Sequence, residues 1–151
     1  MYNIRTINQH IFLLRGKKMD YMKQLYDLAE HSRNMAYAPY SGFKVGAAVK
    51  SRSGKLYAGC NVENISYPCG TCAEAGAIAA MVAGGDTVLA EILIIADTAD
   101  ILPCGNCLQK IAEFGKPDTL VHGADLKGNI KTYKLADLLP HNFNAKEVKH
   151  A

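Results

Sequence analysis

The sequence predicts one α/β domain in which a mixed β-sheet is covered by helices. The length of 151 residues favours a single domain. The pattern along the chain runs helix, hairpin, helix, strand, helix and edge strands, which is typical of one mixed sheet with helical cover. The run Ile92–Ala96 is apolar without a polar face, so we expect a central strand that is buried on both sides.

The N-terminal elements are a helix and a hairpin. The helix is predicted to begin at Asp20, a plausible N-cap, and to end at the turn-forming segment 38–42. Its apolar stripe consists of Met22, Leu25, Leu28 and Ala29. Strands are predicted over 43–49 and 56–62, with a turn at 51–54 between them.

The remaining elements alternate between helix and strand. A polar loop over 64–70 leads into a helix that begins at Cys72 and extends to about Val82. After the central strand, the sequence predicts a helix over 104–114, short strands over 119–121 and 129–133, and a last short helix over 135–139.

Residues 1–18 show no clear helical or strand period, and a second methionine, Met19, follows them. We interpret them as an N-terminal extension that need not be ordered, and residues 19–151 as the domain. The alternative is an arm that packs on a partner subunit. The longest apolar run near the N-terminus, Ile11–Leu14, is too short for a signal-peptide core or a membrane span.

Charge and cysteine content narrow the function classes. The net charge is only +3, the one tight basic cluster is Arg15, Lys17 and Lys18, and the chain has no Trp, so we expect no nucleic-acid partner. Five cysteines without a secretory signal argue against a disulfide framework. We therefore expect a reducing, cytoplasmic location, where clustered cysteines bind metal or react.

Two segments share a cysteine pattern: Cys69-Gly-Thr-Cys72-Ala-Glu74 and Pro103-Cys104-Gly-Asn-Cys107. Each is predicted to lie where a loop becomes a helix, and a helix N-terminus stabilises thiolates. Sulfur ligands at this spacing suit zinc. If all four cysteines bind, the site is closed and structural; if Cys72, Cys104 and Cys107 bind alone, one position stays open for chemistry.

Glu74 favours the open site. A zinc ribbon has no use for a carboxylate two residues after a ligand, whereas a hydrolytic site has, because zinc makes water acidic and a carboxylate moves its protons. Alone, Glu74 would be a first-turn acid favoured by the helix dipole. Together with Pro-Cys-x-x-Cys it forms the pattern of zinc nucleobase deaminases.

Over about residues 37–143 the sequence resembles the homotetrameric zinc-dependent cytidine deaminase family. The matching blocks are 40–48 (Tyr-Ser-Gly-Phe-Lys-Val-Gly-Ala-Ala), Gly59–Asn64, Cys72–Glu74 and Pro103–Cys107, with a weaker fifth at Leu138–Phe143. The resemblance implies a three-layer α/β/α sandwich with one mixed five-stranded sheet. It also implies one zinc ion per subunit and hydrolysis of cytidine and deoxycytidine to the uridines and ammonia, as in pyrimidine salvage.

The family implies roles for the matching positions. Cys72, Cys104 and Cys107 would bind zinc, and Glu74 would be the proton shuttle. Substrate contacts would come from Phe43, Asn61, Glu63, Ala73, Tyr67 and Phe143. Of these, Tyr67 and Phe143 would reach sites in neighbouring subunits, which implies composite active sites in a homotetramer.

Some of these residues also make sense without the family. Asn61 and Glu63 are spaced to point to one face at a strand end, where an amide and a carboxylate can bind vicinal hydroxyls. The alternatives are a turn residue and a solvated charge. Taken alone, Phe43 is more typical of a core residue.

The chain also departs from the family. Ala75 and Leu108 stand where arginines usually follow the catalytic Glu and the last zinc ligand. Without those charges we expect a more electron-rich zinc, with Gln109 as a neutral donor. The smaller side chains would leave room for an N4-substituted cytidine or an aminonucleoside antibiotic. Three roles remain open for Cys69: a spare buried thiol, a fourth zinc ligand in an inhibited state, or none. A separate alternative for the whole chain is a non-catalytic structural module in which all four cysteines bind zinc.

Overall fold

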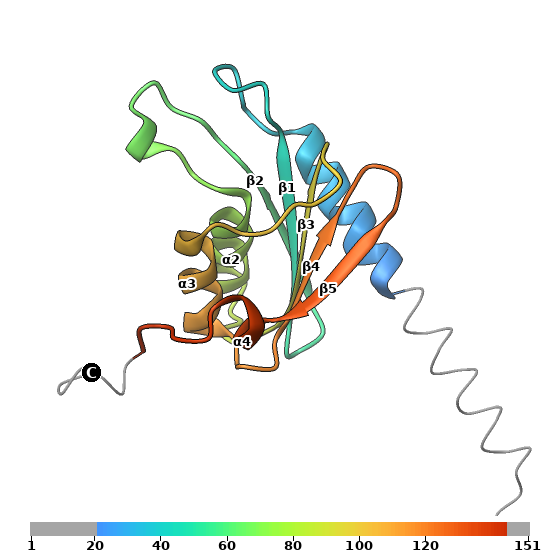
Figure 1. Cartoon of the computed structure of the whole chain (residues 1–151), viewed down its shortest axis with the longest axis vertical. Coiled ribbons are helices and arrows are strands. Elements are labelled where there is room, and N and C mark those ends of the chain that lie inside the picture. The colour runs from blue at the N-terminus through green and yellow to red at the C-terminus, as the bar shows by residue number, and fades with distance from the viewer. Residues whose placement is uncertain (1–20, 145–151) are drawn as a thin grey trace, which may run out of the picture.

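The computed structural model describes residues 21–144. The predicted extension over 1–18 and the predicted N-cap Asp20 lie outside these residues. Five strands of the described part form one sheet in the order β2-β1-β3-β4-β5 (Figure 1). They are β1 Val45–Ser51, β2 Leu56–Cys60, β3 Leu89–Ala96, β4 Leu120–Ala124 and β5 Ile130–Lys134. β3 and β4 are parallel and the other neighbours are antiparallel, so the predicted mixed sheet is confirmed.

Helices cover both faces of the sheet. The helix over residues 21–34 lies on one face, while α2 (Ala73–Ala83) and α3 (Gly105–Phe114) lie on the other (Figure 1). The short α4 (Leu135–Leu138) follows β5 directly. The predicted three-layer α/β/α arrangement is therefore confirmed.

Side chains of the central strand β3 point alternately into two hydrophobic cores, one on each face of the sheet. Ile92 and Ile94 pack with α2 and α3, whereas Leu93 and Ile95 pack with Leu25 of the helix over 21–34. All five side chains are fully buried. A strand that alternates between two cores has no polar face, which is why the apolar run of the sequence predicted its central position.

Two glycines let the helices lie directly on the sheet. A Cβ atom on Gly46 would lie 2.0 Å from the carbonyl oxygen of Ala29, and one on Gly59 would lie 2.3 Å from the amide nitrogen of Ala77. Only a residue without a side chain fits such backbone contact. Gly59 thereby sets the height of α2 above β2, and α2 carries two of the predicted site residues at its start.

The predicted hairpin was too long at both ends. β1 begins at Val45 rather than at residue 43, and β2 ends at Cys60 rather than at residue 62. The reason is Asn61, whose side-chain oxygen accepts a hydrogen bond from Val45 N at 2.8 Å and whose amide donates to Phe43 O at 2.8 Å. These bonds take the place of further ladder hydrogen bonds, and the chain leaves the sheet.

Other boundaries also differ modestly. β3 begins at Leu89, three residues before the predicted run, and β4 extends to Ala124. The loop over 64–70 contains a short 3-10 helix, η1 (Tyr67–Cys69), which Pro68 helps to start. Among residues 21–144, no helix combines the length and the hydropathy that crossing a membrane requires.

Candidate active site

Two cysteines cap neighbouring helices. Cys72 is the N-cap of α2 and Cys104 is the N-cap of α3, and both have an extended backbone. Neither thiol makes a capping hydrogen bond to its own helix. Because α2 and α3 contact each other, their N-termini bring the two predicted cysteine motifs together.

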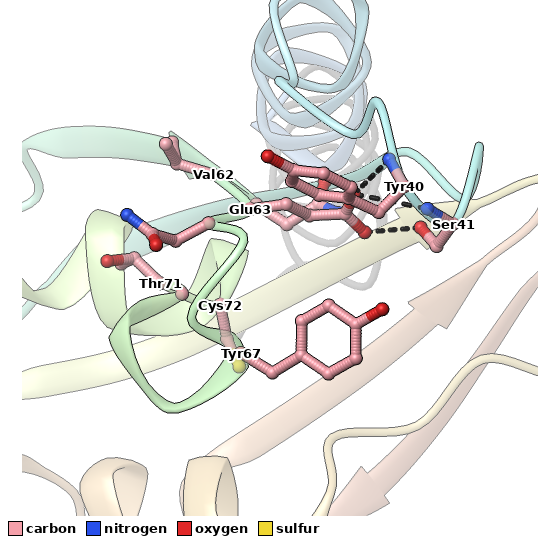
Figure 2. A pocket seen from close by; sticks show the side chains of 10 residues that line it. Tyr40, Ser41, Val62, Glu63, Tyr67, Thr71 and Cys72 are labelled. Atoms are coloured by element: carbon pink, nitrogen blue, oxygen red, sulfur yellow. Dashed lines mark hydrogen bonds between the residues drawn. The ribbon is translucent and has the colours of Figure 1, made fainter.

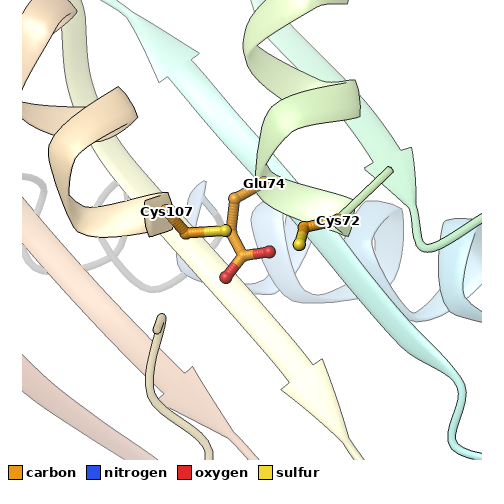
Figure 3. Close-up of side chains that lie close together, drawn as sticks. All are labelled: Cys72, Glu74 and Cys107. Carbon is orange, nitrogen blue, oxygen red and sulfur yellow. The ribbon is translucent and has the colours of Figure 1, made fainter. Parts of the chain in front are cut away.

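Three predicted side chains converge between these helices. The Sγ atoms of Cys72 and Cys107 and a carboxylate oxygen of Glu74 all lie within 4.8 Å of one another (Figure 3). Glu74 is 6% exposed and Cys107 is 1% exposed, whereas Cys72 is partly open. A buried carboxylate between two thiols is costly unless a cation balances it.

The other two cysteines of the motifs, Cys104 and Cys69, lie outside this group. Cys104 is exposed at the start of α3, yet close enough to influence the Cys107 thiol electrostatically. Cys69 is exposed in η1, where its thiol lies 3.5 Å from the Ser66 hydroxyl. The idea that Cys69 is a buried spare thiol is therefore wrong.

The protonation of Cys107 bears on the metal question. Burial raises the pKa of the Cys107 thiol, and the negative charges of Glu74, Cys72 and Cys104 raise this pKa further. A divalent cation would reverse the sign of these interactions and stabilise the anions together. Sulfur and carboxylate donors at this separation fit zinc.

A pocket of about 470 Å³ opens beside this cluster (Figure 2). Its lining consists of Tyr40, Ser41, Asn61, Val62, Glu63, Asn64, Tyr67, Gly70, Thr71 and Cys72. Cys72 belongs to both the pocket and the cluster, so a molecule in the pocket lies next to the candidate metal centre. The size is ordinary for a small-molecule site.

Asn61 and Glu63 line the pocket, and both are bound to the segment before β1. Asn61 bridges Phe43 and Val45, as described above. Glu63 accepts hydrogen bonds from the backbone amides of Tyr40 at 2.9 Å and Ser41 at 3.2 Å, and from the Ser41 hydroxyl. The Ser41 hydroxyl and these amides lower the pKa of the Glu63 carboxyl, although partial burial opposes them. Glu63 is therefore an anion at the pocket wall.

The other predicted substrate residues are more scattered. Phe43 is 42% exposed, so it is not a core residue. Tyr67 is exposed at the pocket of its own chain, with its ring centroid 6.4 Å from that of Tyr40. Ala73 is buried at the start of α2. The exposed Phe143 lines a separate hollow beside α3 and α4, so a single chain does not bring it to the pocket.

The two positions that depart from the family differ in setting. Leu108 is buried within the core between the sheet and α2 and α3, whereas Ala75 is only partly buried. Gln109 donates its side-chain amide to the carbonyl oxygen of Phe143 at 2.8 Å. This bond ties the segment after α4 to α3, so the Gln109 amide is engaged there rather than with a cysteine.

Some residues that line the pocket were not predicted from the sequence. They include Tyr40, Ser41, Val62 and Thr71. Tyr40 and Ser41 belong to the first block that resembles the family, which is the signal that could have identified them.

Comparisons with known proteins agree with this geometry. Residues 18–123 match the family model described as the cytidine and deoxycytidylate deaminase zinc-binding region. The chain is 38% identical over 131 residues to the cytidine deaminase of Sporosarcina psychrophila, covering 86% of this chain and 96% of that protein. It is also 38% identical over 121 residues to the cytidine deaminase of Halalkalibacterium halodurans, covering 80% and 92%.

Solved structures show the same likeness. The crystal structure of cytidine deaminase from Burkholderia pseudomallei matches with a TM-score of 0.76 at 41% identity, over 80% of this chain and 98% of that one. Cytidine deaminase from Mycobacterium tuberculosis matches with a TM-score of 0.71 at 32% identity, over 82% and 97%. By its sequence, its fold and its cysteine motifs, the chain belongs to the cytidine and deoxycytidylate deaminase family of zinc-binding hydrolases.

Proposed function

We propose that this protein hydrolyses cytidine and deoxycytidine to uridine and deoxyuridine, with release of ammonia. The observation that carries the proposal is the buried Glu74 carboxylate, which lies between two thiols next to a pocket of nucleoside size. In a cell this reaction serves pyrimidine salvage. The five free cysteines support a reducing compartment such as the cytoplasm.

The candidate metal ligands are Cys72, Cys104 and Cys107. Zinc at these residues would act as a Lewis acid that makes water a nucleophile near neutral pH. Cys72 and Cys107 belong to the cluster around Glu74, and Cys104 is the N-cap of the helix whose first turn contains Cys107. Three thiolates leave a fourth position open, which a catalytic site requires.

Glu74 is the proton carrier in this proposal. Its carboxylate takes a proton from the attacking water and gives it to the ring nitrogen of the base. Glu74 then takes the remaining proton from the new hydroxyl on C4 and gives it to the amine on the same carbon. The amine leaves as ammonia while the C4 carbonyl of the product forms, and the carboxylate is restored. Burial of Glu74 excludes bulk water from these transfers, and its place in the first turn of α2 fixes it beside Cys72.

Asn61 and Glu63 are proposed to bind the sugar. Both line the pocket, and an amide and a carboxylate complement sugar hydroxyls as donor and acceptor. Phe43 and the backbone of Ala73 are proposed to contact the base. Glu63 is held at the pocket wall by the segment before β1, so its orientation is set before a nucleoside binds.

Assembly into a homotetramer is proposed from two features. Phe143 and Tyr67 are exposed large apolar side chains, and Phe143 does not line the pocket of its own chain. Exposed aromatic residues of this kind are typical of interfaces between subunits. Contributions from Tyr67 and Phe143 to neighbouring sites would complete each pocket.

A second candidate substrate is a cytidine whose exocyclic amine is substituted, as in N4-methylcytidine. The feature that favours it is Ala75, a small residue directly after the proposed proton carrier where the family usually has arginine, but Ala75 does not line the pocket. Leu108 does not favour it, because its side chain fills the core.

Product analysis tests both substrates. Zinc-loaded protein is incubated with cytidine, deoxycytidine and N4-methylcytidine, and the products are separated by chromatography. We expect uridine and deoxyuridine together with ammonia. Release of methylamine from N4-methylcytidine alone would support the second candidate, and no product from any of them would contradict a nucleoside deaminase.

A further inference from the structure

The Ser41 hydroxyl connects two residues that the proposed function uses. It donates a hydrogen bond to Glu63 Oε1 (Figure 2). It also accepts a hydrogen bond from Phe43 N at 3.0 Å. The other carboxylate oxygen of Glu63 is held by the backbone amides of Tyr40 and Ser41. One serine side chain therefore links the orientation of Glu63 to the backbone of Phe43.

Without its partners, Glu63 would be free to rotate. It lies in the irregular segment between β2 and η1, where no helix or strand holds it. The two amides bind only Oε2, so the Ser41 hydroxyl is the contact that fixes the rotation of the carboxylate about its terminal bond. A carboxylate fixed in this way still has free acceptor sites, and Glu63 lines the pocket.

Apart from the Phe43 amide, the backbone around this contact is held by hydrogen bonds that do not involve the hydroxyl. Glu63 N donates to Tyr37 O at 2.8 Å, and Tyr37 N donates to Asn61 O at 3.1 Å. Gly42 adopts a left-handed conformation with φ of 67°, and its amide donates to Ala38 O at 3.0 Å, which closes the turn that carries Ser41. Removing only the hydroxyl should therefore loosen Glu63 while the turn and the segment 61–63 keep their places.

We propose that Ser41 is a positioning residue for sugar recognition, and that its hydroxyl orients the Glu63 carboxylate toward the sugar hydroxyls of the bound nucleoside. This proposal rests on the proposed function, since it assigns the Asn61 and Glu63 end of the pocket to the sugar. The role of Ser41 goes beyond the proposed function, because sugar selectivity then depends on a residue that need not touch the substrate.

The test compares a nucleoside that has sugar hydroxyls with one that lacks the 2′ and 3′ hydroxyls. KM and kcat are measured for cytidine and for 2′,3′-dideoxycytidine with the wild type, Ser41→Ala and Ser41→Thr. Ser53→Ala is the matched control, because the Ser53 hydroxyl also donates to a carboxylate, that of Asp86 at 2.8 Å, but in the β1–β2 turn, which contributes nothing to the pocket lining.

Ser41→Ala should raise KM for cytidine roughly tenfold, the effect expected when a hydrogen bond to a charged group is lost. Its KM for dideoxycytidine and its kcat should stay within about twofold of the wild type, because no sugar hydroxyl is left for Glu63 to bind. Ser41→Thr, which keeps a hydroxyl, should restore most of the affinity, and Ser53→Ala should change neither substrate.

A pH series gives a readout that general loosening would not produce. The Ser41 hydroxyl is the main cause that lowers the pKa of Glu63, so its removal should raise that pKa. As the pH is lowered, KM for cytidine should rise in both proteins once Glu63 becomes protonated. In Ser41→Ala this rise should begin at a higher pH than in the wild type. Equal rises of KM for both nucleosides, or a fall in kcat alone, would overturn the proposal.

Binding measurements distinguish a failure of the role proposed for Ser41 from a failure of the proposed deaminase function. Calorimetric titration with uridine and 2′,3′-dideoxyuridine needs no turnover. If the wild type prefers uridine and Ser41→Ala loses that preference, the role of Ser41 is supported even when no nucleoside is deaminated. If the wild type deaminates cytidine but Ser41→Ala keeps the uridine preference, the proposed function stands and the role of Ser41 is overturned.

Discussion

The Glu74 carboxylate lies within 4.8 Å of the Cys107 thiol, although the two residues belong to the first turns of different helices. This proximity joins the two cysteine motifs of the sequence into one site. Any cation that binds there is surrounded by groups whose ionisation it favours.

The cysteine ligands can be distinguished by metal content. Cys104→Ser and Cys107→Ser should each lose most of the zinc, because an open three-cysteine site cannot spare a thiolate. Cys69→Ser should keep both zinc and activity, because the exposed Cys69 lies outside the cluster around Glu74. Elemental analysis of dialysed protein measures this, and zinc loss in Cys69→Ser would favour the closed four-cysteine module.

The contact between β2 and α2 should be sensitive to a single methyl group. Gly59→Ala would place a Cβ 2.3 Å from Ala77 N, so the helix must shift, which we expect to cost about 1–3 kcal/mol of unfolding free energy. Gly76→Ala is the matched control in the same interface, because its Cβ would meet only ordinary contacts of 3.5 Å or more. Urea unfolding curves measure both, and equal stability of the two variants would show that the packing tolerates the shift.

The fold was predictable where burial imposes a periodicity. The side chains of Ile92–Ala96 pack into cores on both faces of the sheet, so their uniform apolar character predicted a central strand. Cys72 and Cys104 also precede helices, as the sequence predicted. The hairpin ends were not predictable, because Asn61 replaces ladder bonds with side-chain bonds to residues far away in sequence.

The site was predictable only in part, for a related reason. Sequence spacing placed Glu74 beside Cys72, because both lie at one helix start. The Ser41–Glu63 and Gln109–Phe143 hydrogen bonds join segments that are distant in sequence, and neither has a local signature. Such contacts become visible only when the fold has placed both partners.

A partly buried ionic contact around Glu91 should make the stability of the fold depend on pH. Glu91 Oε2 lies 3.3 Å from His122 Nε2, and Glu91 Oε1 lies 3.6 Å from Lys50 Nζ. The hydrogen bond from His122 and the charge of Lys50 lower the pKa of Glu91 in the folded protein, although burial opposes them. A lowered folded-state pKa stabilises the fold above the unfolded value of about 4.3 and loses that effect as the pH falls.

Glu91→Gln should therefore be less stable than the wild type at pH 7, by about 1–3 kcal/mol, and this difference should shrink toward pH 3. Urea unfolding at both pH values measures the difference. Asp100→Asn is the control, because it removes an exposed ion pair with Lys131 and should cost little. A stability difference for Glu91→Gln that is the same at both pH values would contradict the assigned role of the Glu91 charge.

The role of Glu74 as proton carrier is the central claim, and cytidine turnover tests it most directly. The change in ultraviolet absorbance from cytidine to uridine is followed on protein of known zinc content, for the wild type, Glu74→Gln and the exposed control Glu113→Gln. We expect Glu74→Gln to keep its zinc and to lose about 10²–10⁴-fold in kcat, while Glu113→Gln keeps full activity. Unchanged turnover by zinc-loaded Glu74→Gln would contradict the account.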